Sequence, residues 1–185
     1  MSKIIMGIDP GTQVLGYGVI EVEGNKNMRL LVYGAIRFNK SEAHIQRLSK
    51  IYQRVSQLLQ DYKPDEFAIE SPFYGKNIQA MLNLGRGQGV AIAAALNYGL
   101  TSISEYAPRK IKQAVTGNGS ATKEQVLKML CSMLEKIETP DYLDASDAIA
   151  VAVCHFFNRR TAEQKSVKSY SSWRRFVEQN PERVK

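Results

Sequence analysis

The sequence contains little cysteine and no long apolar run. Its only cysteines, Cys131 and Cys154, stand in apolar segments without a Cys-x-x-Cys or Cys-His spacing, which argues against zinc or redox chemistry. We expect both to be buried and reduced. The longest nearly uncharged stretches, residues 89–100 and 148–157, are well short of the roughly 20 residues that cross a bilayer. Because the apolar segment 4–8 is also too short for a signal peptide, we expect a cytoplasmic protein with no membrane partner.

The chain also lacks an even distribution of charge. Its 185 residues are 44% hydrophobic, enough for a buried core, and carry a formal net charge of +7. Lys and Arg exceed Asp and Glu by 5 in residues 158–185 and by 3 in residues 70–125, whereas residues 126–157 carry 3 more acidic than basic residues. A basic surface around an acidic patch suits a protein that attracts a polyanion and keeps its carboxylates for another task. A solvated basic tail would explain the tail but not the carboxylates.

Hydrophobic periodicity predicts a single α/β domain over residues 1–160. The expected strands are 4–8, 15–23, 29–38, 66–70 and 100–106, and the expected helices are 43–62, 77–98, a short piece after Pro108, one opened by Thr122, and 144–158. This order predicts a mixed five-stranded sheet, with three antiparallel strands plus two parallel ones, flanked by helices. Residues 161–185 have few aliphatic side chains, so we expect a basic C-terminal tail that includes at most a short helix around 173–179.

Two carboxylates stand at the ends of strands that the topology brings together. Asp9 ends the first strand and Glu70 ends the strand before the second long helix. A right-handed crossover lays these strands side by side and parallel, about 4.8 Å apart, so both acids share one end of the sheet. Ligands usually bind beyond the carboxyl ends of such strands.

Two further carboxylates, Asp144 and Asp147, are three residues apart and therefore lie on one face of the last helix. Each alone is adequately explained as a residue at a helix N-terminus. Together with Asp9 and Glu70, however, they form a set of oxygen ligands that suits Mg²⁺ or Mn²⁺ rather than zinc. Two such ions, about 3.5 to 4 Å apart, can activate water and stabilise the leaving oxygen in phosphodiester hydrolysis.

Two other interpretations bear on these residues. The Asp-x-Gly-Thr turn at residues 9–12 also forms the phosphate-binding hairpin of actin-like ATPases, and the motif alone does not decide between the two. Those ATPases need a second domain, for which a chain of this length has no room. His155 lies about 16 Å along the helix from Asp144, too far to ligate the same ion, so we expect a hydrogen-bonded core histidine.

Four stretches carry a family resemblance: 7–12 (GIDPGT), 69–77 (IESPFYGKN), 115–123 (VTGNGSATK) and 144–150 (DASDAIA). In this order they resemble the RuvC family of Holliday junction resolvases, which are bacterial endonucleases with an RNase H-like fold. Asp9, Glu70, Asp144 and Asp147 align with the catalytic, metal-binding tetrad of that family.

The resemblance implies a homodimer that resolves a four-way DNA junction by paired symmetric nicks in recombination and repair. It implies two Mg²⁺ ions per active site, for which Mn²⁺ can substitute, and work beside a branch-migration motor complex. Phe73 matches an aromatic residue that stacks on a base, Lys112 and Lys123 match basic residues near the scissile phosphate, and Lys76 is a weaker DNA-binding candidate. A Phe packed under a turn and solvated surface lysines are the structural alternatives. Two other functions stay open: another RNase H-like nuclease, and a non-catalytic junction-binding module.

Overall fold

A computed structural model describes residues 2–11, 13–24, 27–39, 41–72, 77–134, 143–168 and 177, apart from the side chains of 143, 144 and 160–168. The strands are β1 (Ser2–Pro10), β2 (Val14–Glu23), β3 (Asn27–Arg37), β4 (Glu66–Glu70) and β5 (Ile103–Tyr106). They form one sheet in the order β3-β2-β1-β4-β5, with β1, β2 and β3 antiparallel and β4 and β5 parallel to β1. The predicted mixed five-stranded sheet is therefore confirmed.

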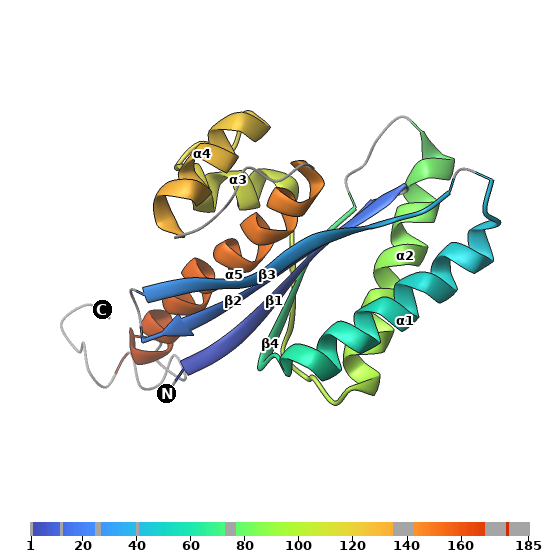
Figure 1. Ribbon diagram of the computed structural model, residues 1–185. Coiled ribbons are helices and arrows are strands. Elements are labelled where there is room, and N and C mark those ends of the chain that lie inside the picture. The colour runs from blue at the N-terminus through green and yellow to red at the C-terminus, as the bar shows by residue number, and fades with distance from the viewer. Residues whose placement is uncertain are drawn as a thin grey trace.

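Helices cover both faces of this sheet (Figure 1). They are α1 (His44–Tyr62), α2 (Ile78–Asn97), α3 (Pro108–Thr116), α4 (Lys123–Met133) and α5 (Leu143–Lys168). The pair α1 and α2 packs on one face, and α5 crosses the other face against β1, β2 and β4. The short helices α3 and α4 pack on α5 rather than on the sheet.

Local signals explain where several elements begin and end. The Asn77 side chain accepts a hydrogen bond from the backbone N–H of Ala80 at the start of α2. Thr122 and Gln125 form the predicted capping box of α4. Strand β5 begins at Ile103 rather than at residue 100, because the chain first turns at Gly99, whose φ is +99°.

The last helix differs most from its prediction. It continues to Lys168, ten residues past the expected end at 158, because residues 159–168 contain no glycine or proline to stop it. The helix therefore crosses the expected boundary at residue 160, and the division into a domain and a tail stays a prediction. The expected short helix at 173–179 lies outside the described residues, except for Val177.

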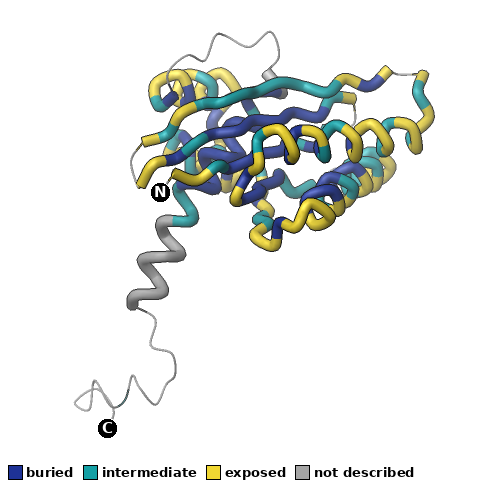
Figure 2. Tube along the Cα trace, turned by 60° about the horizontal axis from the view of Figure 1, so that its bottom comes forward, coloured by how far each residue is buried: buried dark blue, intermediate teal, exposed yellow. Residues whose placement is uncertain are grey.

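The alternation of side chains along the strands divides the core in two. Figure 2 shows buried inner strands, an edge strand β3 of intermediate burial, and helices with exposed outer surfaces. In β4, Phe67 and Ile69 pack with α1 and α2, whereas Ala68 packs with α5. Glu66 and Glu70 share the parity of Ala68 and therefore project from the face of the sheet that α5 covers. The burial pattern thus assigns both acids to the same side.

One cysteine prediction is wrong. Both thiols are free, and Cys154 is buried as expected, but Cys131 is exposed. Helix α4 buries only the stripe that contains Val126 and Leu130, and Cys131 lies beside this stripe. Within the described part of the chain, no helix has the length and apolar character needed to span a membrane.

Candidate active site

The first feature of the site is the adjacency of β1 and β4. The two strands are parallel neighbours in which Ile8 and Ile69 are Cα partners. Asp9 and Glu70 each follow their partnered isoleucine by one residue, and both are half-buried. The predicted meeting of these two strand ends is therefore confirmed.

Two glycines allow α5 to approach this end of the sheet. Gly7 of β1 and Gly18 of β2 are Cα partners. A Cβ atom on Gly7 would lie 2.4 Å from the carbonyl oxygen of Ala148, and one on Gly18 would lie 2.9 Å from the backbone nitrogen of Ile149. Because neither position has room for a side chain, the backbone of α5 rests directly on the sheet. Asp147, which precedes Ala148, is thereby brought to the end of β1.

A third carboxylate and two amines interact electrostatically with Glu70. Burial raises the pKa of the Glu70 carboxyl to about 8, and the negative charges of Asp9 and Asp147 add to this rise. The positive charges of Lys123 and Lys112 act in the opposite direction. Four residues from four other elements, β1, α3, α4 and α5, therefore interact with Glu70.

Lys123 makes a direct contact in this cluster. Its Nζ lies 2.5 Å from Oδ2 of Asp147, and its side chain is 48% exposed while that of Asp147 is 19% exposed. The capping box at Thr122 fixes the first turn of α4, where Lys123 is the first residue. The site thus combines a repelling set of carboxylates with a solvent-facing amine.

The remaining predicted site residues lie outside what the structure describes. Asp144 is in the first turn of α5, three residues before Asp147, but its side chain is not described. Phe73 and Lys76 fall in the undescribed segment 73–76. The described side chains alone do not include a group of three or more His, Cys, Asp or Glu residues that could hold a metal ion.

The chemistry of the donors nevertheless fits a hard divalent cation. Asp9, Glu70 and Asp147 offer only carboxylate oxygens, which suit Mg²⁺ or Mn²⁺. Burial, together with the negative charges of Asp9 and Asp147, raises the pKa of Glu70 to about 8 and so keeps this carboxyl mostly protonated at pH 7. A bound cation would relieve the repulsion among the carboxylates and favour the ionised form.

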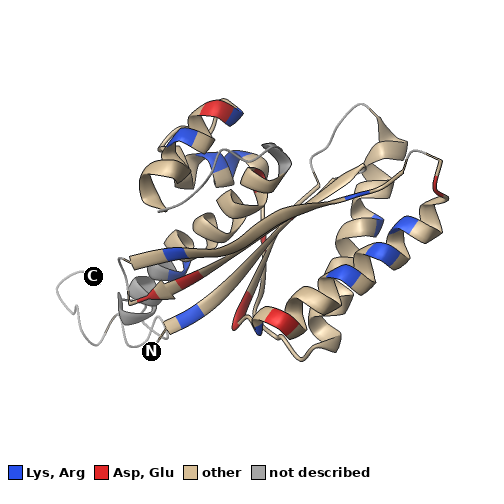
Figure 3. Cartoon of the chain, in the orientation of Figure 1, with Lys and Arg blue, Asp and Glu red and all other residues tan. Residues whose placement is uncertain are grey.

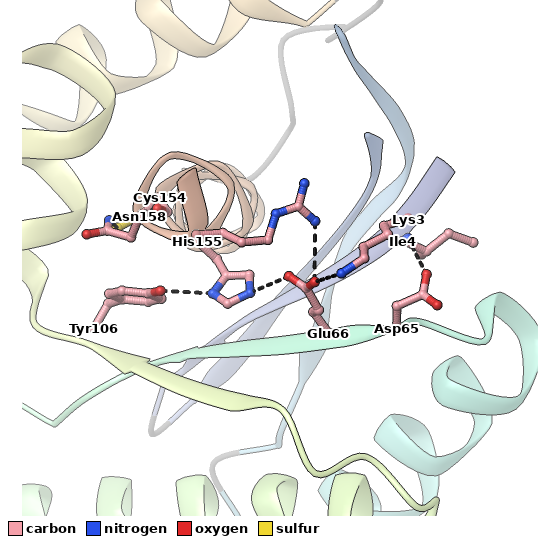
Figure 4. Close-up of polar contacts among 9 residues, drawn as sticks. Lys3, Ile4, Asp65, Glu66, Tyr106, Cys154, His155 and Asn158 are labelled. Carbon is pink, nitrogen blue, oxygen red and sulfur yellow. Dashed lines mark hydrogen bonds and ion pairs between the residues drawn. The ribbon is translucent and has the colours of Figure 1, made fainter. Parts of the chain in front are cut away.

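His155 is a core histidine, as expected. It is 5% exposed, and its Nδ1 and Nε2 atoms each lie 2.8 Å from a partner, Tyr106 Oη and Glu66 Oε2 respectively (Figure 4). Neither partner was expected from the sequence. A glutamate at the first position of the short apolar strand 66–70 is the one signal that could have indicated Glu66, since a buried acid needs partners.

Further basic residues lie on α3 and α4, the two helices that carry Lys112 and Lys123. Figure 3 shows basic positions on both helices, which pack outside α5. They include Arg109, Lys110 and Lys112 on α3 and Lys123 and Lys128 on α4. This distribution attracts a polyanion toward the carboxylates.

Comparison with known proteins identifies relatives over the whole chain. The family described as "Crossover junction endodeoxyribonuclease RuvC" matches residues 5–155. A protein of the same name in Cytophaga hutchinsonii is 50% identical over 185 residues, which cover 100% of this chain and 90% of the relative. Another in Bacteroides fragilis is 50% identical over 186 residues, which cover 100% of this chain and 97% of the relative.

Solved structures agree with this assignment. A structure described as "T. thermophilus RuvC in complex with Holliday junction substrate" has a TM-score of 0.80 and 32% identity, and the match covers 86% of this chain and 96% of that chain. A yeast mitochondrial Holliday junction resolvase, with a TM-score of 0.65 at 12% identity, shares the fold. The expected RNase H-like fold is therefore confirmed. By its match from β1 into α5 and by its full-length relatives, this chain belongs to the RuvC family of crossover junction endodeoxyribonucleases.

Proposed function

We propose that this protein resolves four-way DNA junctions by metal-dependent hydrolysis of phosphodiester bonds, in recombination and repair. The observation that carries the proposal is the meeting of Asp9 and Glu70 at the ends of the parallel neighbours β1 and β4, where burial and the charges of Asp9 and Asp147 raise the pKa of Glu70 to about 8. Such a perturbed carboxylate at the carboxyl ends of parallel strands is typical of a catalytic site. Membership of a nuclease family implies divalent metal dependence, and we propose Mg²⁺ as the ion, with Mn²⁺ as a substitute.

Each site residue has a proposed role. Asp9, Glu70, Asp144 and Asp147 would hold two divalent ions, which supply activation of water and stabilisation of the leaving oxygen when bound. Lys123 presents its amine at the edge of the carboxylates, where it can hold a phosphate oxygen once it leaves Asp147. Lys112, whose charge also lowers the pKa of Glu70, extends this positive edge.

Strand separation near the cut is assigned to Phe73, by stacking on an unpaired base, and Lys76 is a weaker candidate for a backbone contact. The substrate is a four-way junction, and two copies of the chain are needed because paired nicks require two active sites. We therefore propose that the protein acts as a homodimer, beside a branch-migration motor complex, in the cytoplasm.

The proposal is tested by comparing substrates. Purified protein is incubated with a labelled four-way junction, a linear duplex of the same sequence and an RNA–DNA hybrid, with Mg²⁺ or with a chelator, and strand lengths are read on a denaturing gel. Paired nicks in the junction alone, and only with metal, support the proposal. Cutting of the duplex or hybrid at the same rate would identify a different RNase H-like nuclease, and binding without nicks would identify a non-catalytic junction-binding module.

A further inference from the structure

A buried polar network lies on the α5 face of the sheet, at the opposite end of β4 from Glu70 (Figure 4). The Glu66 carboxylate is its centre and is 6% exposed. Besides the contact with His155, Glu66 Oε1 lies 2.7 Å from Lys3 Nζ and 3.3 Å from Arg159 Nη1. The network therefore joins the starts of β1 and β4 to the middle of α5.

The direction of each hydrogen bond follows from the ionisation states. Burial alone would raise the pKa of Glu66, but hydrogen bonds from Lys3 and His155 outweigh this effect and lower it, so Glu66 is a carboxylate that only accepts. Burial lowers the pKa of His155, so its imidazole is neutral at pH 7. The Nε2–H of His155 therefore donates to Glu66, and the Tyr106 hydroxyl donates to Nδ1.

The distance between the two acids on β4 matches the distance between their two partners on α5. Glu66 and Glu70 are four residues apart on β4, about 13 Å at roughly 3.3 Å per residue. His155 and Asp147 are eight residues apart on α5, about 12 Å at 1.5 Å per residue. Since Asp147 interacts with Glu70 and His155 bonds to Glu66, α5 runs antiparallel to β4 and meets it at two points with nearly equal separation.

Tyr106 connects the same network to the strand beside Glu70. Tyr106 and Glu70 are Cα partners in the ladder between β4 and β5, and the Tyr106 hydroxyl reaches His155. A shift of α5 by one helical turn, about 5.4 Å, would break both bonds of His155 and carry Asp147 away from Glu70. The two points at which α5 meets β4, at Asp147 and at His155, therefore shift together.

We propose that Glu66, His155 and Tyr106 form a positioning clamp that fixes the axial register of α5 on β4 and so sets Asp147 against Glu70. These are positioning residues, because the hydrogen bonds described for their side chains join them to one another, to Lys3 and to Arg159. The inference rests on the proposed function, since it assigns the carboxylates the task of holding metal. A clamp of this kind affects metal affinity and turnover, whereas a merely stabilising network affects only the free energy of unfolding.

The test compares variants that differ in the clamp but not in the site. Tyr106→Phe removes one hydroxyl, His155→Leu removes both bonds, and His155→Gln retains a donor and an acceptor. Val55→Ala is the matched control, because Val55 is fully buried on the opposite face of the sheet, among α1 and α2. The free energy of unfolding of each variant is measured first by urea denaturation, so that variants of equal stability are compared.

Mn²⁺ binding without DNA is then titrated by calorimetry, junction affinity is measured in chelator, and cleavage is measured at saturating junction. We expect Tyr106→Phe and His155→Leu to weaken Mn²⁺ binding and lower kcat about tenfold, as for other groups that orient metal ligands. Junction affinity in chelator should not change, and His155→Gln should recover most of the loss. Val55→Ala should leave Mn²⁺ binding and kcat unchanged.

Two results would overturn the clamp: unchanged Mn²⁺ affinity and kcat in Tyr106→Phe, or an equal loss in Val55→Ala at equal stability. The Tyr106→Phe variant keeps the test decisive if His155→Leu does not fold. Failure of the proposed function is distinguishable, since a wild type that binds Mn²⁺ but cleaves no junction refutes the resolvase, while the Mn²⁺ titration still decides the clamp.

Discussion

A Cβ atom on Gly7 would lie 2.4 Å from the carbonyl oxygen of Ala148, closer than a real Cβ atom approaches backbone. This contact explains how α5 comes near enough to β1 for the charge of Asp147 to act on Glu70, as that of Asp9 does. The close approach is therefore a condition for the site as well as for the core.

Gly7→Ala should lower the free energy of unfolding by about 1–3 kcal/mol, the usual cost of inserting a methyl group into a packed interior. The backbone of α5 cannot move aside as a flexible side chain would. Urea denaturation measures the change. The control is Gly89→Ala on α2, where a Cβ atom meets nothing within 4 Å and the helix gains about 0.5–1 kcal/mol. Equal stability of the two variants would show that α5 does not rest on Gly7.

The lowered pKa of His155 predicts how its contribution to the free energy of unfolding depends on pH. Burial lowers this pKa below the ordinary 6.5, although Glu66 opposes the shift. Between the folded pKa and 6.5 the unfolded chain binds more protons, so the stability contributed here is present above pH 6.5 and is lost as pH falls through the folded pKa.

Wild type should therefore lose stability relative to His155→Gln as pH falls below 6.5, by at most about 1.4 kcal/mol per pH unit. The comparison with this variant is necessary because Glu70 titrates with the opposite sign: its raised pKa favours the folded protein as pH falls from about 8 toward 4.5. Urea denaturation at several pH values gives the difference. A difference that is constant with pH would contradict the assigned neutral imidazole.

Metal binding should release a proton from Glu70. With a pKa of about 8, this carboxyl is mostly protonated at pH 7, and it must ionise to become a ligand. Calorimetric titration of Mg²⁺ at pH 7, in buffers with different ionisation enthalpies, should show release of nearly one proton. Glu70→Gln should show none, whereas equal release in that variant would assign the proton to another group.

Loss of the Lys123 amine should lower kcat much more than it lowers junction affinity. Removing one such donor from a reacting centre lowers kcat by about 100-fold or more. We expect this loss in Lys123→Gln with little change in junction affinity. Lys128→Gln is the control, since Lys128 is exposed farther along the same helix. Equal kcat values in the two variants would make Lys123 an ordinary surface lysine.

Local signals and chain topology predicted most of the fold. The switch from two-residue to helical periodicity located α1, and the spacing of Thr122 and Gln125 marked the start of α4. The adjacency of Asp9 and Glu70 followed from the handedness of the crossover, without reference to side-chain contacts. These features depend on nearby residues or on general rules of connection.

Other features depend on packing between distant segments and could not be predicted. The bond between Glu66 and His155 joins residues 89 positions apart, and its existence depends on the register of α5. The exposure of Cys131 depends on which stripe of α4 faces α5. The need for glycine at Gly7 and Gly18 appears only when α5 is placed on the sheet.

Cleavage is expected to depend on the carboxylates at the ends of β1 and β4 and at the start of α5. The most direct test incubates wild type and Asp9→Asn with a labelled four-way junction in Mg²⁺, and measures junction binding and strand lengths in the same samples. Wild type should produce paired symmetric nicks, and Asp9→Asn should bind the junction with similar affinity and produce none. Undiminished cleavage by Asp9→Asn would contradict the account.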